Sequence, residues 1–329
     1  MAGHPVRPNV SNRPHQSRVS IELHSDRALY VKYRDELKRD QGAVSTFGVS
    51  ALSCDRRVGR VVVAVSQSAV GEKYGPWALV LGASEGIGAS FGRYAAELGI
   101  NVVLVARRAG VLEELASELH ETYGIEARSL PLDLSEPDAG DALASLTKEL
   151  EIGLLIMNAG ADDHGRSFLD VPVDEWLALV QRNNVLTLKA CHHFAQPMRT
   201  RGRGGIILVS SGAGWCGGAR IVIYSASKAF DRNLAEGLWA ELAPFGVDVL
   251  SLVVPPTDTP ALRRLLSRAD LSVEGLASPE EVAREGIDHL GDGPIYIPNE
   301  EPDAPVSAAA RRQMVLAVSE GTKAFFGDT

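Results

Sequence analysis

Residues 77–88 read WALVLGASEGIG. Five apolar residues, Trp77 to Leu81, lead into a turn that is rich in glycine, and apolar side chains then recur at helical spacing. A strand, a glycine turn and a helix in this order let the backbone approach a pyrophosphate, whose charge is stabilised by the exposed N–H groups of the helix N-terminus. The stretch therefore predicts a dinucleotide site that includes Gly82, Ser84, Gly86, Ile87 and Gly88.

Short apolar runs alternate with helical segments from Tyr74 onward. The apolar runs are nearly continuous, which is typical of strands that are buried on both faces beneath helices. The pattern predicts an α/β fold, a doubly wound parallel sheet of Rossmann type in a single domain with an N-terminal extension. The strands are expected at residues 77–81, 101–106, 127–132, 152–157, 205–210, 248–254 and 294–297.

Charge divides the chain into two parts. Residues 1–70 carry 11 Lys and Arg against 6 Asp and Glu, whereas the whole chain has a formal net charge of −9. Residues 71–329 are acidic and repel a phosphate backbone, so nucleic acid is disfavoured as a partner. We expect a basic, partly disordered N-terminal extension (1–70), a dinucleotide-binding catalytic domain (71–300) and a C-terminal helical segment (301–329).

Two further elements are predicted in the extension. Leu29, Tyr33 and Leu37 recur on one face of a helix that Ser25 would cap, and Val61 to Val65 is apolar enough for a strand. Residues 307–326, with Met314, Val315, Phe325 and Phe326, predict an amphipathic C-terminal helix.

Composition favours a particular cellular compartment for the chain. Hydrophobic residues make up 45% of the chain and charged residues 23%, which is typical of a soluble globular protein. The longest uncharged run is shorter than the roughly twenty apolar residues that span a bilayer, so no membrane span is predicted. Three cysteines, an odd number without paired metal spacing, favour a reducing cytoplasm.

The end of the second predicted strand bears on the choice of cofactor. An NAD-selective site would place a carboxylate about twenty residues beyond the glycines to bind the ribose hydroxyls, but this chain has Ala106 and Arg107 there. The planar guanidinium of Arg107 can pair with a 2′-phosphate. We therefore expect NADP in preference to NAD.

Four motifs in this order resemble the short-chain dehydrogenase/reductases over about residues 74–300. They are Gly82-x3-Gly86-x-Gly88, Asp133-Leu134, Asn158-Ala159-Gly160 and Tyr224-x3-Lys228. The form of the glycine turn resembles the compact subgroup, nearest to 3-ketoacyl and 17β-hydroxysteroid-type reductases. The resemblance implies reversible hydride transfer between a nicotinamide and a small-molecule carbonyl or alcohol. It also implies cofactor contacts from Asp133, Leu134, Asn158, Ala159, Gly160, Tyr224, Lys228, Pro255 and Thr257, and a homodimer or homotetramer.

The same resemblance implies the catalytic residues. Tyr224 and Lys228 match the family's tyrosine and lysine, and Ser211 lies thirteen residues before the tyrosine. The catalytic asparagine is Asn183 when counted from Trp176 and Asn184 when counted back from Pro197; we select Asn184, and the alternative stays open.

Electrostatics supports these roles. A phenol exchanges protons near neutral pH only if its anion gains about 4 kcal/mol of stabilisation. An ammonium about 4 Å away at an effective dielectric constant of 20 provides about 4 kcal/mol, and residues at i and i+4 share a helix face. Ser211 would polarise the substrate carbonyl and the asparagine would hold a water that relays protons to Lys228.

Three departures from the family pattern concern the cofactor loops. Leu81 stands where Thr or Ser usually precedes the first glycine, Met157 replaces the first Asn of the NNAG motif, and Pro256 replaces a glycine. Residues 257–277 resemble the substrate-binding segment, in which Arg263, Arg264 and Arg268 either attract an anionic thioester or form a solvated basic face.

Several alternatives remain open from sequence. Cys191-His192-His193 does not predict a metal site, because neighbours on a helix diverge by about 100°. The altered cofactor motifs leave a catalytically idle dinucleotide-binding sensor or scaffold as the contrasting hypothesis. Residues 1–69 could also reflect a misplaced start, since the family-like sequence opens near Val70.

Overall fold

The chain divides into two compact units, residues 1–48 and 49–329. The computed structural model describes residues 20–22, 30–32, 52–55, 60–63, 67–162, 165–269, 272–298, 309, 312–313 and 316. In the first unit, β1 (Ser20–Glu22) pairs antiparallel with β2 (Tyr30–Lys32). The helix predicted through Leu29, Tyr33 and Leu37 is therefore wrong at Tyr30–Lys32, where a backbone pairing partner outweighs a weak helical pattern. The rest of that predicted helix lies outside the described residues.

The second unit opens with a hairpin. Strand β3 (Leu52–Asp55) pairs antiparallel with β4 (Arg60–Val63), which includes part of the predicted 61–65 strand. Helix α1 (Gln67–Tyr74) follows. Of the predicted 307–326 helix, only positions 309, 312–313 and 316 are described, and all of these are helical.

Seven parallel strands form the central sheet, in the order β11-β10-β9-β8-β5-β6-β7. The strands are β5 (Trp77–Leu81), β6 (Asn101–Ala106), β7 (Ala127–Pro131), β8 (Ile152–Met157), β9 (Gly204–Ser211), β10 (Val247–Val254) and β11 (Ile295–Tyr296). The strand order reverses between β5 and β8, the point at which doubly wound sheets bind ligands beyond their carboxyl ends. The predicted Rossmann-type sheet is confirmed.

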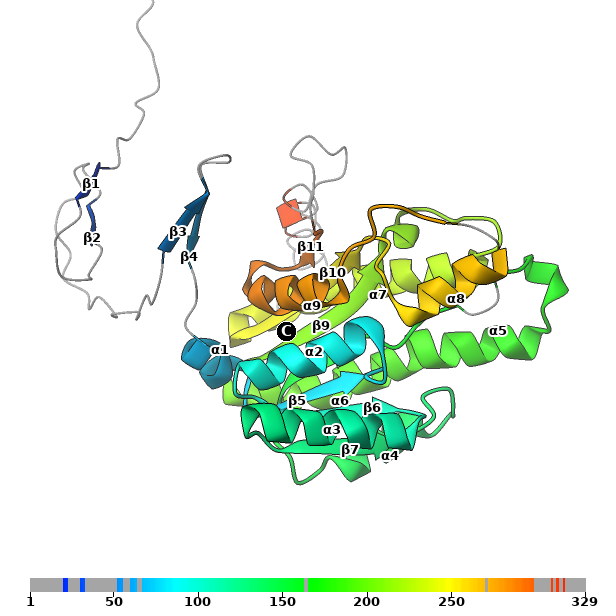
Figure 1. The fold of residues 1–329 in the computed structure, drawn as a ribbon, viewed down its shortest axis with the longest axis horizontal. Coiled ribbons are helices and arrows are strands. Elements are labelled where there is room, and N and C mark those ends of the chain that lie inside the picture. The colour runs from blue at the N-terminus through cyan, green and yellow to red at the C-terminus, as the bar shows by residue number, and fades with distance from the viewer. Residues whose placement is uncertain are drawn as a thin grey trace, which may run out of the picture. The chain divides into compact units, whose positions relative to one another are not determined.

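Helices cover both faces of this sheet (Figure 1). Apolar side chains of α2 (Gly86–Glu97), α3 (Ala109–Tyr123) and α9 (Pro279–Asp288) build the core on one face. Those of α4 (Ala139–Leu146), α6 (Leu186–Arg201) and α7 (Val222–Leu242) build the core on the other face. Fully buried strand residues such as Leu79, Leu104 and Leu155 lie between the layers, as their continuous apolar runs predict.

The remaining helical elements connect these strands and helices along the chain. They are η1 (Phe168–Asp170), α5 (Val173–Val180), η2 (Gln181–Val185), η3 (Gly212–Trp215), η4 (Ala243–Phe245), α8 (Pro260–Ala269) and η5 (Leu290–Asp292). Among the described residues, no helix combines the length and the apolar character that crossing a bilayer requires.

Candidate active site

The glycine turn lies at the carboxyl end of β5. Gly82 and Gly86 have φ angles of 82° and 56°, in the left-handed region that favours glycine. A Cβ on Gly88 would lie 2.1 Å from the Gly82 carbonyl oxygen, so only glycine allows this close approach. Each of these three positions therefore requires glycine, because a side chain there would have to displace its neighbours.

The first turn of α2 fits an anionic group. Glu85 is the N-cap residue of α2, but its side chain makes no capping hydrogen bond, so the N-terminal N–H groups of the helix have no side-chain acceptor from this residue. The site of a nicotinamide dinucleotide implied by the sequence therefore fits the residues present: a glycine cradle that a Cβ would fill and a helix N-terminus without a side-chain cap.

The neighbouring strand β8 supports this turn. Asn158 follows β8, and its Nδ2 donates to the Gly82 carbonyl at 3.0 Å. A Cβ on Gly82 would lie 2.9 Å from Ala159 Cα, so the two loops touch through their backbones. Of the other predicted cofactor residues, Asp133 accepts a hydrogen bond from the Ser135 N–H at 2.9 Å and Leu134 is buried. Thr257 is also buried, and its hydroxyl donates to the Pro255 carbonyl at 2.8 Å.

Arginines approach the glycine turn from two sides. Arg108 Nη2 donates to Ser84 Oγ at 3.0 Å and pairs with Glu85 at 2.6 Å, whereas Arg107 is exposed at the end of β6. Arg264 on α8 pairs with the same Glu85 carboxylate. Hydrogen bonds from Arg264 and then Arg108 lower the pKa of Glu85. The sequence predicts Arg107 as the cofactor residue, and the structure adds that its neighbour Arg108 is the arginine that contacts Ser84 of the glycine turn.

Tyr224 and Lys228 lie one turn apart on α7. Lys228 Nζ lies 5.9 Å from the centre of the Tyr224 ring. The lysine is buried, and its Nζ donates to the Val209 carbonyl at 2.8 Å and to Asp231 Oδ2 at 3.1 Å. The ammonium therefore lies beside the phenol ring, where a positive charge favours the phenolate form.

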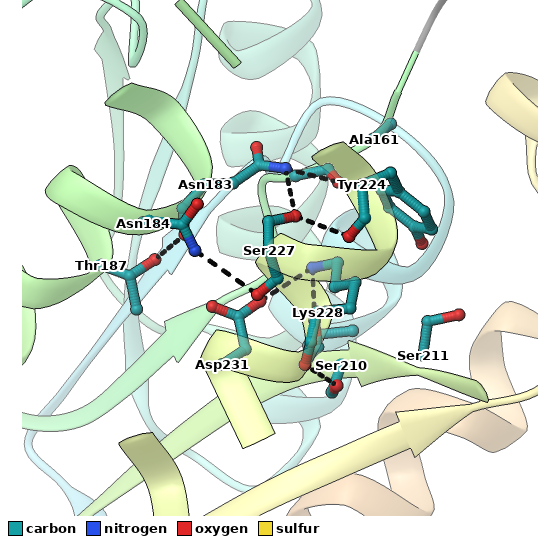
Figure 2. Close-up of polar contacts among 12 residues, drawn as sticks. Ala161, Asn183, Asn184, Thr187, Ser210, Ser211, Tyr224, Ser227, Lys228 and Asp231 are labelled. Carbon is teal, nitrogen blue, oxygen red and sulfur yellow. Dashed lines mark hydrogen bonds and ion pairs between the residues drawn. The ribbon is translucent and has the colours of Figure 1, made fainter. Parts of the chain in front are cut away.

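Ser211 lies at the end of β9, on the same side of Lys228 as the Tyr224 ring (Figure 2). Its Oγ accepts a hydrogen bond from the Ala213 N–H at 3.2 Å. A hydroxyl has one donor and two acceptor sites, so this contact leaves its proton free to donate to an incoming oxygen. The adjacent Ser210 points elsewhere: its hydroxyl donates to the Lys228 carbonyl at 2.9 Å.

The loop that carries Ser211 is attached to the helix that carries Tyr224. Arg232 on α7 donates to the Gly214 carbonyl at 2.7 Å, and its guanidinium lies 4.5 Å from the centre of the Trp215 ring. A Cβ on Gly214 would lie 2.8 Å from the Lys228 carbonyl carbon. The η3 loop therefore packs directly on the α7 backbone beside Lys228.

The two candidate asparagines occupy different positions (Figure 2). Asn183 is 1% exposed, and its Nδ2 donates to the Gly160 carbonyl at 3.3 Å and to Ser227 Oγ at 3.1 Å. Asn184 is half-buried, and its Nδ2 lies 3.4 Å from the Ser227 carbonyl. A Cβ on Gly160 would lie 2.9 Å from Lys228 Nζ and 3.4 Å from Asn183 Oδ1. It is thus Asn183 that the fold places beside Gly160 and Lys228.

The side chains of Cys191 and its two histidine neighbours on α6 point in different directions. Cys191 is buried in the core, and desolvation, followed by the charge of Asp231, raises the pKa of its thiol to about 12. His192 and His193 are exposed. Helical geometry alone accounts for this divergence.

The chain was compared with known proteins. Residues 76–270 match the family model described as short chain dehydrogenase. The chain belongs to the short-chain dehydrogenase family. Short-chain dehydrogenases of this kind are oxidoreductases that transfer a hydride between a nicotinamide cofactor and a carbonyl or secondary alcohol, and the chain is such an enzyme.

Individual relatives are consistent with the family match. The chain is 35% identical over 229 residues to a 7beta-hydroxysteroid dehydrogenase of Clostridium sardiniense, covering 70% of this chain and 87% of the relative. It is 35% identical to a very-long-chain 3-oxoacyl-CoA reductase of Podospora anserina, covering 67% and 64%. A short-chain dehydrogenase from Sphingobium yanoikuyae, solved in complex with NADPH, superposes with a TM-score of 0.64 at 27% identity, covering 76% and 95%.

Proposed function

We propose that this short-chain dehydrogenase is an NADPH-preferring ketone reductase or alcohol dehydrogenase in which Tyr224 is the general acid and base. The observation that carries the proposal is the buried Lys228 ammonium, 5.9 Å from the centre of the Tyr224 ring, at the carboxyl edge of the sheet. A bound nicotinamide supplies or accepts the hydride. In reduction, the Tyr224 hydroxyl donates a proton to the substrate oxygen, and in oxidation the phenolate removes it.

Each neighbouring side chain has a defined part in this reaction. Lys228 stabilises the phenolate by its charge. Ser211 donates its free hydroxyl proton to the substrate oxygen as negative charge develops there. We assign the water-holding role to Asn183 in place of Asn184, because the position that a Cβ on Gly160 would take lies 3.4 Å from Asn183 Oδ1 and 2.9 Å from Lys228 Nζ.

The preference for NADPH rests on the arginines beside the glycine turn. Arg107 is exposed at the end of β6, so its guanidinium is available to a 2′-phosphate, and Arg108 beside it contacts Ser84 of the glycine turn. Glu85, which would repel a phosphate, is paired with Arg108 and Arg264. The NADPH-bound relative supports the same preference.

The names of the relatives suggest the substrate class. One is named for a hydroxysteroid and another for a very-long-chain 3-oxoacyl-CoA, and both substrates carry a ketone or secondary alcohol on a large apolar body. We propose a bulky apolar ketone or alcohol for this chain. A cytoplasmic location remains a prediction from cysteine usage, and a homodimer or homotetramer remains a prediction from the family resemblance.

The test has a binding arm and a turnover arm. NADPH and NADH are titrated against the protein by cofactor fluorescence, and the tighter ligand is then used with a panel of hydroxysteroids and apolar ketones. We expect NADPH to bind at least about tenfold more tightly, because a bidentate phosphate contact contributes more than 1 kcal/mol. Tyr224→Phe should lower turnover by about a hundredfold or more while cofactor affinity stays unchanged.

The binding measurement and the turnover measurement test separate parts of the proposal. Equal affinity for NADH and NADPH would contradict the cofactor preference alone. Retention of most turnover by Tyr224→Phe would remove Tyr224 from the mechanism.

A further inference from the structure

A buried carboxylate lies beneath the proposed catalytic lysine. Asp231 is on α7, three residues after Lys228, and its Oδ2 lies 3.1 Å from Lys228 Nζ (Figure 2). The side chains of Asp231 and Lys228 are 6% and 5% exposed. A buried ion pair is weak evidence for stability, because desolvation of both charges offsets their attraction. Stability alone therefore does not explain why Asp231 is buried next to Lys228, and the position of the pair beside Tyr224 has to be considered.

The Lys228 ammonium is fixed from three directions. Two of its three N–H groups are used by the Val209 carbonyl and Asp231 Oδ2. The Gly160 backbone closes a third side, because a Cβ there would lie 2.9 Å from Nζ. One donor is left for the side on which Tyr224 lies.

The Asp231 carboxylate directs its charge to the lysine. Its Oδ1 is buried and has no hydrogen-bond partner among the described residues. Burial raises the pKa of Asp231, while Lys228 opposes that change by its charge and hydrogen bond. A carboxylate used to build a hydrogen-bond network would have both oxygens paired.

The other groups that face the pair do not supply a counter-charge. The Cys191 thiol on α6 interacts with Asp231, and burial, followed by the charge of Asp231, raises the pKa of that thiol and keeps it neutral. Asn183 of η2, Ser227 of α7 and Ser210 of β9 contribute neutral amide and hydroxyl groups. Among the described residues, Asp231 is the acid that contacts Lys228.

We propose that Asp231 is a positioning residue of the hydride-transfer site, which keeps Lys228 protonated in its dry surroundings and aims the remaining N–H toward Tyr224. This inference rests on the proposed roles of Tyr224 and Lys228. Without the carboxylate, the buried ammonium would lose its counter-charge, and burial would favour the neutral amine. The neutral amine no longer stabilises the Tyr224 phenolate.

The test removes the charge of residue 231 and keeps the shape of its side chain. Asp231→Asn is compared with Glu236→Gln, which neutralises another buried acid of α7 outside the site. The first readout is the pH profile of kcat/KM for alcohol oxidation. We expect activity of Asp231→Asn to decline at a pH at least about one unit lower than in the wild type, a tenfold change in proton affinity, with cofactor affinity unchanged. Glu236→Gln should keep the wild-type profile.

The second readout does not need turnover. The tyrosinate absorbance of each protein is titrated, and the titration of its Tyr224→Phe counterpart is subtracted, which leaves the signal of Tyr224. In the Asp231→Asn background we expect this signal to emerge at higher pH. Should Asp231→Asn fail to fold, Asp231→Ser, which leaves room for a water molecule, carries the same expectation.

The outcomes distinguish this inference from the function on which it rests. A Tyr224 signal that is unmoved, or that emerges at lower pH, would overturn the role of Asp231, because Lys228 would then stay charged without it. A wild-type protein without Tyr224-dependent turnover would count against the proposed function, while the absorbance titration would still decide the effect of Asp231 on Lys228.

Discussion

At the residue scale, the assignment of the active-site asparagine depends on a one-residue difference. Asn183 contacts Gly160 and Ser227 through its amide, and Asn184 contacts the Ser227 backbone from the other side. We expect Asn183→Ala to lower kcat by about tenfold or more, because the proton relay to Lys228 loses its anchor. Asn184→Ala is the matched control and should stay within a few-fold of the wild type.

Steady-state kinetics at fixed pH, with cofactor affinity measured in parallel, checks this expectation. A larger loss for Asn184→Ala than for Asn183→Ala would reverse the assignment. The buried Asn183 also contributes to stability, so kcat is compared at a temperature at which both variants are folded, as judged by circular dichroism.

At the element scale, one π-helical segment contains both candidate asparagines. Residues Gln181–Val185 form the π-helical segment η2 between α5 and α6. A π-turn takes up one more residue than an α-turn. Spacing from Trp176 or from Pro197 alone therefore does not distinguish Asn183 from Asn184, whereas the contacts of the two side chains do.

The sequence was most informative where burial alone determines the element. Strands β5, β6 and β8 have the predicted bounds, since continuous apolar runs fit strands covered on both faces. The site was predicted in part: the spacing of Tyr224 and Lys228 follows from helix periodicity. Asp231 lies at i+7 from Tyr224, on the same face, and that signal was available. The contact of Arg108 with Ser84 depends on side-chain direction, which spacing does not determine.

Helix α9 offers a prediction about stability. Ser278 Oγ accepts hydrogen bonds from the N–H groups of Glu280 and Glu281, at 3.2 and 3.3 Å. Ser278→Ala should reduce the free energy of unfolding by about 1 kcal/mol, since those donors lose their acceptor. Chemical denaturation measures the loss. Ser278→Thr keeps the hydroxyl and should be nearly neutral; an equal loss in both variants would contradict the capping role.

At the scale of the whole molecule, exposed apolar residues on the helices next to the site point to self-association. Val173 and Leu177 on α5 are 63% and 58% exposed, and Phe230 on α7 is 37% exposed. Helical residues at i and i+4 share a face, so Val173 and Leu177 form one apolar strip. We expect a dimer or tetramer by light scattering, and Leu177→Glu should shift the mass toward the monomer.

The control for this prediction is Leu146→Glu on α4, where the replaced leucine is 56% exposed on a helix outside the strip. Both variants add the same charge, so a general solubility effect would change them equally. A monomeric wild type, or a mass unchanged by Leu177→Glu, would contradict the expectation.

The η3 loop is joined to α7 by a hydrogen bond and by backbone packing. The contact of Arg232 with Gly214 joins the loop that follows Ser211 to the helix that carries Tyr224. Thr259, in the segment that enters α8, lies instead beside Gly86 of the glycine turn, because a Cβ on Gly86 would come within 2.9 Å of the Thr259 methyl carbon. A substitution in the segment that enters α8 would therefore leave the contact between Arg232 and Gly214 in place.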